Sequence, residues 1–217
     1  AELAEAVSSG IRDAGCDVID IGLGGTEMVY FATGHLDADG GIMVTASHNP
    51  ANYNGLKIVR AKSRPVSADS GLVDIRALAE LDDRLMDVKK GTVDSVSIVE
   101  AYCKKLLSYV DIGKLKPLKI AVNAGNGGAG LIIDKLETKL PFDFVKIHHQ
   151  PDGNFPNGVP NPMLEENRKP TMDAISSSTA DFGIAWDGDF DRCFFFDENG
   201  RFIEGYYIVG LLAANQL

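Results

Sequence analysis

The sequence is poor in cysteine, in basic residues and in long hydrophobic runs. Its three cysteines, at positions 16, 103 and 193, are widely spaced and form no C-x-x-C pair, which is typical of a reduced chain without structural disulfides. No apolar run reaches the ~18 residues that a membrane-spanning helix needs, and no signal-peptide pattern opens the chain. We therefore expect a soluble, cytoplasmic protein with no membrane partner.

Basic residues are outnumbered by acidic ones, 21 to 31, which gives a net charge of −10. No stretch rich in Lys or Arg is present to neutralise nucleic-acid phosphates, so we expect no nucleic-acid partner. The 217 residues, 45% of them hydrophobic, supply a core for one large domain or two smaller ones. Nothing in the pattern indicates an oligomeric state.

Short apolar runs typical of strands alternate with helical patterns along the whole chain. This alternation predicts an α/β fold of three-layer α/β/α domains with mixed, largely parallel sheets, in which functional groups collect at strand ends. The expected strands cover residues 17–21, 42–45, 56–60, 118–122, 142–147, 182–186 and 193–196. The expected helices cover residues 3–15, 26–33, 67–88, 97–109, 131–140 and 171–177.

A serine follows one of these strands. The run Ile42–Thr45 lies between glycines and an Asn-Pro pair, which predicts a buried strand that ends just before Ser47. Pro50 keeps the preceding Asn49 out of the helical region, so the loop cannot wind directly into a helix. Beside the imidazole of His48 and the amide of Asn49, the Ser47 hydroxyl is a candidate nucleophile. A hydroxyl that only satisfies loop amides is the alternative.

Three aspartates alternate after another expected strand, 182–186, in the stretch Asp187-Gly188-Asp189-Phe190-Asp191-Arg192. Carboxylates this close are costly to hold together unless a cation neutralises them, so the stretch predicts a metal site. An EF-hand calcium loop shares the aspartate spacing, but Arg192 stands where that loop needs glycine, and an apolar run follows. A hydrated surface loop remains the other alternative.

The serine loop, which carries Ser47, and the aspartate loop, residues 187–192, would form one site if Ser47 carries a phosphoryl group. Such a group adds roughly −1.5 to −2 charge at pH 7 and needs a cation beside it, and Mg²⁺ commonly combines carboxylate and phosphate oxygens. Lys57, at the start of the strand 56–60, and Arg192 would add positive charge around the phosphoryl oxygens, where most of the catalysis of phosphoryl transfer arises. A solvated Lys57 is the alternative.

A glycine motif between the expected strand 118–122 and helix 131–140, Gly125-x-Gly127-x-x-Gly130, matches the dinucleotide-binding fingerprint. The next strand, however, ends in His148-His149 and not in the acidic residue that would hold a ribose. We therefore expect these glycines to serve a tight turn and close helix packing. The two histidines lack the spacing typical of a zinc site.

The combination of motifs resembles the α-D-phosphohexomutase superfamily. Thr45-Ala46-Ser47-His48-Asn49-Pro50 and the aspartate stretch 187–192 look like its two signature loops. Asn54-Gly55-Leu56-Lys57 and Asp152-Gly153-Asn154-Phe155-Pro156-Asn157 are similar to bacterial phosphomannomutases in particular. The resemblance covers essentially the whole chain.

The resemblance implies an isomerase that interconverts mannose 6-phosphate and mannose 1-phosphate through a bisphosphorylated sugar. By this likeness Ser47 is the phosphoserine, and Mg²⁺ is bound by Ser47 with Asp187, Asp189 and Asp191. Lys57 and His48 would assist proton transfer and charge neutralisation, and Arg192 and Asn49 would bind substrate. Hexose phosphate and hexose 1,6-bisphosphate are the implied partners.

The resemblance also implies a four-domain enzyme of which this chain holds part. Residues 1–95 would be most of domain I, 96–197 domain II, and 198–217 the beginning of domain III. The chain begins with a helical pattern and ends with an apolar element, neither of them capped, so we expect a fragment of a longer protein. By the resemblance, most of domain III and all of domain IV are missing, so we expect the fragment to be inactive alone. The sugar preference, with phosphoglucomutase or phosphoglucosamine mutase as alternatives, depends on a loop outside this sequence.

Three further functions stay open. A magnesium-dependent phosphatase with an aspartate nucleophile would use the stretch 187–192 without Ser47. A serine hydrolase is disfavoured because Ala46-Ser47-His48 lacks the glycine-flanked elbow. A non-catalytic remnant would bind phosphate or Mg²⁺ without turnover.

Overall fold

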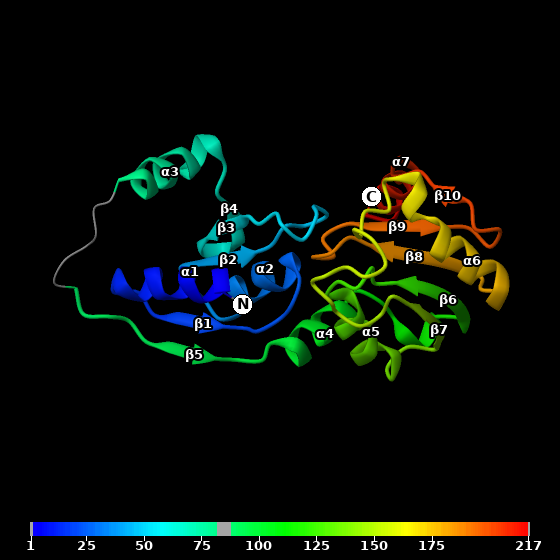
Figure 1. Ribbon diagram of the computed structural model, residues 1–217. Helices are drawn as coiled ribbons and strands as arrows, with labels where there is room; N and C mark the ends of the chain where they lie inside the picture. Colours follow the sequence, from blue (N-terminus) through cyan, green and yellow to red (C-terminus); the bar gives the residue numbers. More distant parts are fainter. Residues whose placement is uncertain (1, 82–87, 217) are drawn as a thin grey trace. The chain divides into compact units, whose positions relative to one another are not determined.

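The computed structural model describes residues 2–81 and 88–216 (Figure 1). The chain divides into two compact units. The first comprises Ala1–Leu23, Met28–Thr45 and Gly55–Ile98, and the second Gly24–Glu27, Ala46–Asn54 and Val99–Leu217. The short segments Gly24–Glu27 and Ala46–Asn54 thus belong to the second unit, although most of their neighbours in the sequence belong to the first.

The helices and strands follow one another in the predicted alternation, which confirms the α/β class. The helices are α1 (Glu2–Asp13), α2 (Thr26–His35), α3 (Leu72–Glu80), α4 (Val99–Leu107), α5 (Ala129–Glu137), α6 (Lys169–Ser178) and α7 (Gly205–Gln216). The strands are β1 (Val18–Asp20), β2 (Gly40–Val44), β3 (Leu56–Arg60), β4 (Arg64–Pro65), β5 (Val93–Ser95), β6 (Leu118–Asn123), β7 (Phe142–Ile147), β8 (Phe182–Trp186), β9 (Cys193–Phe196) and β10 (Phe202–Ile203).

The first unit contains a parallel pair, β1 with β5, and an antiparallel sheet in the order β2-β3-β4. Helix α2 packs closely here because residue 41 of β2 is glycine: a Cβ there would lie 2.3 Å from Thr33 Oγ1 and 2.9 Å from Val29 Cγ1. Val29 and Val59 are both buried. This small core supports β2, which leads into the serine loop.

The helix predicted over 67–88 is shorter than expected. Helix α3 ends at Glu80, and Leu81 is already extended. The part of the prediction over 82–87 lies outside the described residues.

The second unit is built on a five-stranded sheet in the order β10-β9-β8-β6-β7. Strand β6 is parallel to β7 and to β8, and β9 and β10 add antiparallel pairs at one edge. The predicted mixed sheet is therefore confirmed, with its parallel strands at the centre and at the other edge.

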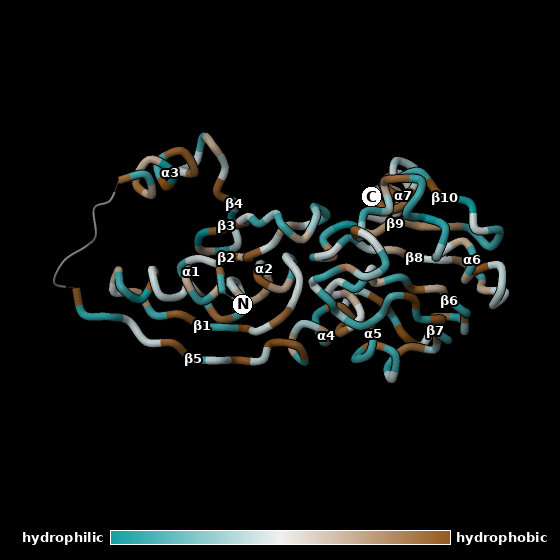
Figure 2. Tube along the Cα trace, in the orientation of Figure 1, coloured by the Kyte–Doolittle hydropathy of each residue, from teal (hydrophilic) through white to brown (hydrophobic). Residues whose placement is uncertain are grey.

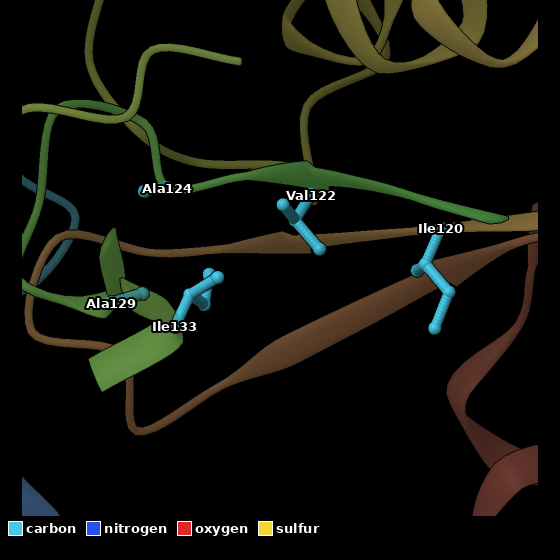
Figure 3. Close-up of a cluster of buried hydrophobic side chains, with 5 residues drawn as sticks. All are labelled: Ile120, Val122, Ala124, Ala129 and Ile133. Carbon is cyan, nitrogen blue, oxygen red and sulfur yellow. The ribbon is translucent and has the colours of Figure 1, made fainter. Parts of the chain in front are cut away.

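Helices cover both faces of this sheet, as the alternation of side chains along β6 requires. On one face Ile120 and Val122 pack with Ala129 and Ile133 of α5 (Figure 3). On the other face Ala121 packs in a cluster with Ile175 of α6, Ala185 and Phe196. The result is the predicted three-layer α/β/α arrangement.

Apolar residues are frequent along α3 and α7 (Figure 2), and many of their side chains are exposed. Tyr206, Val209 and Leu211 of α7 are each more than half exposed, and α3 has no buried residue. Within the described ranges, no helix has both the length and the apolar character needed to cross a bilayer.

Candidate active site

Ser47 lies in a loop that follows β2, as the sequence predicted. Its Oγ donates a hydrogen bond to Oδ2 of Asp187, at 3.0 Å, and lies 3.2 Å from Nδ1 of His48. Its backbone is left-handed, with φ of 55°, a conformation that costs a non-glycine residue about 1–2 kcal/mol. Such strain often accompanies a functional site, and here it occurs at the predicted nucleophile.

Arg192 joins the serine loop to the aspartate loop. Its Nη2 donates to Oγ of Ser47 at 2.8 Å and to Oδ2 of Asp187 at 2.5 Å, and it also contacts Nδ1 of His48. The backbone N–H of Arg192 donates to the other oxygen of Asp187, Oδ1, at 3.2 Å. One guanidinium therefore meets the hydroxyl, the imidazole and a carboxylate, all of which belong to the second unit.

Asp187, Asp189 and Asp191 converge. Each offers a carboxylate oxygen, and these oxygens all lie within 4.8 Å of one another. Asp187 and Asp189 are buried, and Asp191 is half-buried. An oxygen-only set of this kind fits a hard divalent cation such as Mg²⁺.

The electrostatics of Asp187 also favour a cation. Burial, followed by the negative charge of Asp189, raises the pKa of Asp187, and Arg192 only partly opposes this. A divalent ion would remove the cost of holding these charges together. The donor set and its charge therefore suit the predicted metal.

The loops approach one another closely because residue 188 is glycine. A Cβ at Gly188 would lie 2.6 Å from the backbone oxygen of Ser47 and 3.4 Å from Cγ of Pro160. The aspartate loop is also bonded to the loop of the glycine motif, residues 125–130, since the N–H of Gly128 donates to the oxygen of Gly188 at 3.1 Å. The motif at 125–130 thus supports the site through its backbone.

Thr26 is a site neighbour that the sequence did not identify as such. It was predicted only as the first residue of the helix expected over 26–33, yet its Oγ1 donates to Oδ2 of Asp189 at 2.8 Å and its N–H to the backbone oxygen of Asp189 at 3.2 Å. The Gly-Gly pair before α2, followed by Thr26 as the first residue of the helix, is a weak signal for this contact, because nothing local connects it to a loop 163 positions away.

Asn49 and Lys57 were also predicted as site residues. Asn49 turns back on its own loop, where its Nδ2 donates to the oxygen of Ala46 at 2.9 Å. Lys57 lies on β3 in the first unit, half-buried and opposite Met43. The substrate-binding role of Asn49 and the catalytic role of Lys57 stay predictions.

The two adjacent histidines have different environments. Nε2 of His149 lies 2.8 Å from Oδ1 of Asp134, which Lys146 also contacts. Burial lowers the pKa of His148, whose backbone has φ of 44°. His149 is thus hydrogen-bonded to the carboxylate of the Asp134–Lys146 ion pair, which joins α5 to β7.

In chemical terms the cluster offers a hydroxyl with two proton acceptors and a cation. Asp187 and His48 lie beside the Ser47 oxygen, and Arg192 supplies positive charge. A phosphate on this oxygen would face a guanidinium, whose geometry suits phosphate. The three aspartates would hold a divalent ion next to it.

Two family models match the chain. The model of phosphoglucomutase/phosphomannomutase alpha/beta/alpha domain I matches residues 1–80, and that of alpha/beta/alpha domain II matches residues 100–200.

Individual proteins agree with these matches. A curated "Phosphohexose mutases" protein of Xanthomonas campestris pv. campestris (strain B100) is 61% identical over 211 residues, which are 97% of this chain and 47% of that protein. A phosphomannomutase of Vibrio cholerae serotype O1 is 56% identical over 217 residues, with the same two shares. A solved phosphoglucomutase/phosphomannomutase family protein from Burkholderia thailandensis gives a TM-score of 0.83 at 30% identity over 99% of this chain and 48% of that one. The chain spans about half the length of these relatives.

Proposed function

The chain belongs to the phosphoglucomutase/phosphomannomutase family, and we propose that it carries the phosphoserine and the magnesium site of a phosphohexomutase. The enzyme would interconvert mannose 6-phosphate and mannose 1-phosphate through a hexose 1,6-bisphosphate. The observation that carries this proposal is the hydrogen bond between Ser47 and Asp187, with Arg192 bonded to both.

Ser47 is the proposed carrier of the phosphoryl group. In the direction that phosphorylates the enzyme, the Ser47 oxygen forms a bond to phosphorus, the sugar oxygen leaves with its electron pair, and the serine proton passes to a nearby base. His48 Nδ1 and Asp187 both lie within 3.2 Å of Oγ. When the enzyme returns the phosphoryl group to a sugar, the sugar oxygen forms the bond to phosphorus, and the Ser47 oxygen leaves and recovers its proton. No oxidant or further reactant is needed.

Asp187, Asp189 and Asp191 would hold Mg²⁺, completed by an oxygen of the Ser47 phosphate. When bound, the ion neutralises charge on the phosphoryl oxygens in the transition state. The chain's own contribution is to place the carboxylates within 4.8 Å of one another and to keep water away from the two buried ones.

Arg192 and Asn49 would bind phosphate or sugar oxygens, and Lys57 would supply a further positive charge and assist proton transfer. We also propose that residues 1–95 and 96–197 correspond to domains I and II of the family, and that 198–217 begins domain III. The mannose preference rests on likeness to phosphomannomutases. A cytoplasmic location is likewise proposed.

The test uses a full-length protein that contains this chain. Supplied with mannose 1-phosphate, Mg²⁺ and a trace of hexose 1,6-bisphosphate, it is expected to form the 6-phosphate, and Ser47→Ala is expected to lose at least about 10³-fold in rate because the nucleophile is absent. Ser177→Ala is the matched control, since Ser177 is an exposed serine of α6.

The site of phosphorylation separates the proposal from its closest competitor. Peptide mass mapping is expected to find the phosphoryl group on Ser47. A label on Asp187 with release of inorganic phosphate would instead indicate a phosphatase. Full activity in Ser47→Ala would exclude the nucleophile assignment.

A further inference from the structure

We propose that Thr26 is a positioning residue that holds Asp189, and with it the aspartate loop, in the geometry needed for the metal. As far as it concerns metal, this inference rests on the proposed function. Its structural part, that Thr26 fixes the loop, can be tested without any metal.

Thr26 holds Asp189 at two points. The hydroxyl donates to the carboxylate at 2.8 Å, and the backbone N–H of the same residue donates to the backbone oxygen of Asp189 at 3.2 Å. Thr26 is fully buried, and Asp189 is 3% exposed. Because both the side chain and the backbone of Asp189 are bonded to one residue, the direction of its carboxylate is fixed relative to the loop.

The residue before Thr26 must be small for these bonds to form. A Cβ at Gly25 would lie 2.4 Å from Cζ of Phe190 and 2.7 Å from the backbone oxygen of Asp189. The segment Gly24–Glu27 belongs to the second unit together with the aspartate loop. The close contact is therefore a feature of that unit itself.

The loop of the glycine motif 125–130 supports Gly188, the residue before Asp189 in the aspartate loop. The N–H of Gly128 donates to the oxygen of Gly188, and a Cβ at Gly128 would lie 2.8 Å from Cε1 of Phe190. The oxygens of Gly188 and Asp189 are thus bonded to two different loops. Of these two loops, the one with Thr26 also bonds the carboxylate of Asp189, so the Thr26 side chain can orient that proposed ligand.

Groups that hydrogen-bond a ligating carboxylate typically change metal affinity 10- to 100-fold when removed. The Thr26 hydroxyl has this relation to Asp189. Thr26→Val preserves the shape and the backbone N–H while removing the hydroxyl. Thr26→Ser retains the hydroxyl and should retain the function.

The first measurement is hydrogen–deuterium exchange of the metal-free 217-residue chain. In Thr26→Val, amides of the peptide covering 187–192 are expected to exchange at least about 10-fold faster, because the loop loses a hydrogen bond to a charged group. Thr33→Val is the matched control: Thr33 is buried in the same helix, and its hydroxyl donates to the oxygen of Val29 at 2.8 Å.

The second measurement is the affinity of the same variants for Mn²⁺, followed by electron paramagnetic resonance. Thr26→Val is expected to weaken binding by about 10-fold or more, and Thr26→Ser and Thr33→Val by less than about 3-fold. Unchanged loop exchange in Thr26→Val, or equal loop exchange in Thr26→Val and Thr33→Val, would overturn the positioning role. Faster loop exchange in a chain that binds no Mn²⁺ would support the positioning role and count against the proposed metal site.

Discussion

The hydroxyl of Ser47 and the carboxylate of Asp187, 140 positions apart in the chain, share a hydrogen bond of 3.0 Å. The same carboxylate oxygen accepts from Nη2 of Arg192. The proposed nucleophile, Ser47, and the proposed metal ligand, Asp187, therefore belong to one hydrogen-bonded group. Arg192 is bonded to both of them.

Arg192→Met is expected to destabilise the metal-free chain by about 2–3 kcal/mol, because the buried Asp187 loses a charged partner. Urea denaturation measures the loss, and Mg²⁺ should recover part of it. Arg76→Met is the control, since the Arg76–Glu80 pair is exposed and such pairs contribute less than about 1 kcal/mol. Equal losses in the two variants would show that Arg192 does not stabilise the site.

The stabilisation by Mg²⁺ is expected to grow as pH rises through the pKa of Asp187. That pKa is raised above 3.8, mainly by burial and then by Asp189. The folded chain therefore binds more protons than the unfolded chain between the two pKa values, and its metal-free stability falls as pH rises across that window. Mg²⁺ competes with these protons for the carboxylate, so its effect is smallest at low pH.

Melting temperatures with and without Mg²⁺, from about pH 4 to pH 8, test this dependence. Asp187→Ala should remove it. Asp197→Asn should not, because the pKa of Asp197 is lowered, first by the N–H of Arg201, and its contribution to stability is lost as pH falls. A Mg²⁺ effect that is constant with pH would contradict the role of Asp187.

Much of the fold was predictable because its signals are local. The apolar runs that became β6 and β8 and the helical periodicity of α5 depend on neighbouring residues only. Strand β5 was missed because Val93–Ser95 is too short and too exposed to show a pattern, and it is a strand through its pairing with β1. Long-range pairing of this kind leaves no local signal.

The site divides in the same way. Ser47 and the three aspartates were predicted from their chemistry and from their positions after strand ends. In the structure, Ser47, His48 and Arg192 lie together beside Asp187. Thr26 was not predicted as a site neighbour, because its partner is distant in sequence and threonine is common at helix starts. The sequence predicted that the glycine motif serves close packing, but it did not predict that the motif contacts Gly188.

Asn126 is expected to organise the loop that follows β7. Its backbone is left-handed, with φ of 58°. Its Nδ2 donates to the oxygen of Gln150, and its Oδ1 accepts from Nδ2 of Asn157, both at 2.9 Å. Asn126→Gly keeps this backbone and should cost about 1–2 kcal/mol for the two bonds. Asn126→Ala should cost about 1 kcal/mol more, because alanine disfavours the left-handed region.

Guanidinium denaturation, with exchange of a peptide covering 150–158, measures both variants. Asn154→Ala is the control within the same loop, because Asn154 is exposed and its hydrogen bonds among the described residues go to the nearby Asp152. A smaller loss in Asn126→Ala than in Asn126→Gly would contradict the role assigned to the backbone conformation.

Gly127→Ala should disturb the metal site without altering any proposed ligand. A Cβ at this position would lie 2.4 Å from the oxygen of Gly188 and 2.9 Å from its Cα. The neighbour is backbone and cannot rotate away, so the aspartate loop must shift, at a cost of about 1–3 kcal/mol. Gly153→Ala is the control, because no heavy atom of the described residues, apart from its chain neighbours, lies within 4 Å of its Cβ position, and a change within about 0.5 kcal/mol is expected. Urea denaturation gives the stabilities, and Mn²⁺ titration should show weaker binding in Gly127→Ala alone. Unchanged Mn²⁺ affinity in a destabilised Gly127→Ala would mean that the aspartates keep their geometry when the glycine loop moves, so that this loop supports the fold and not the site.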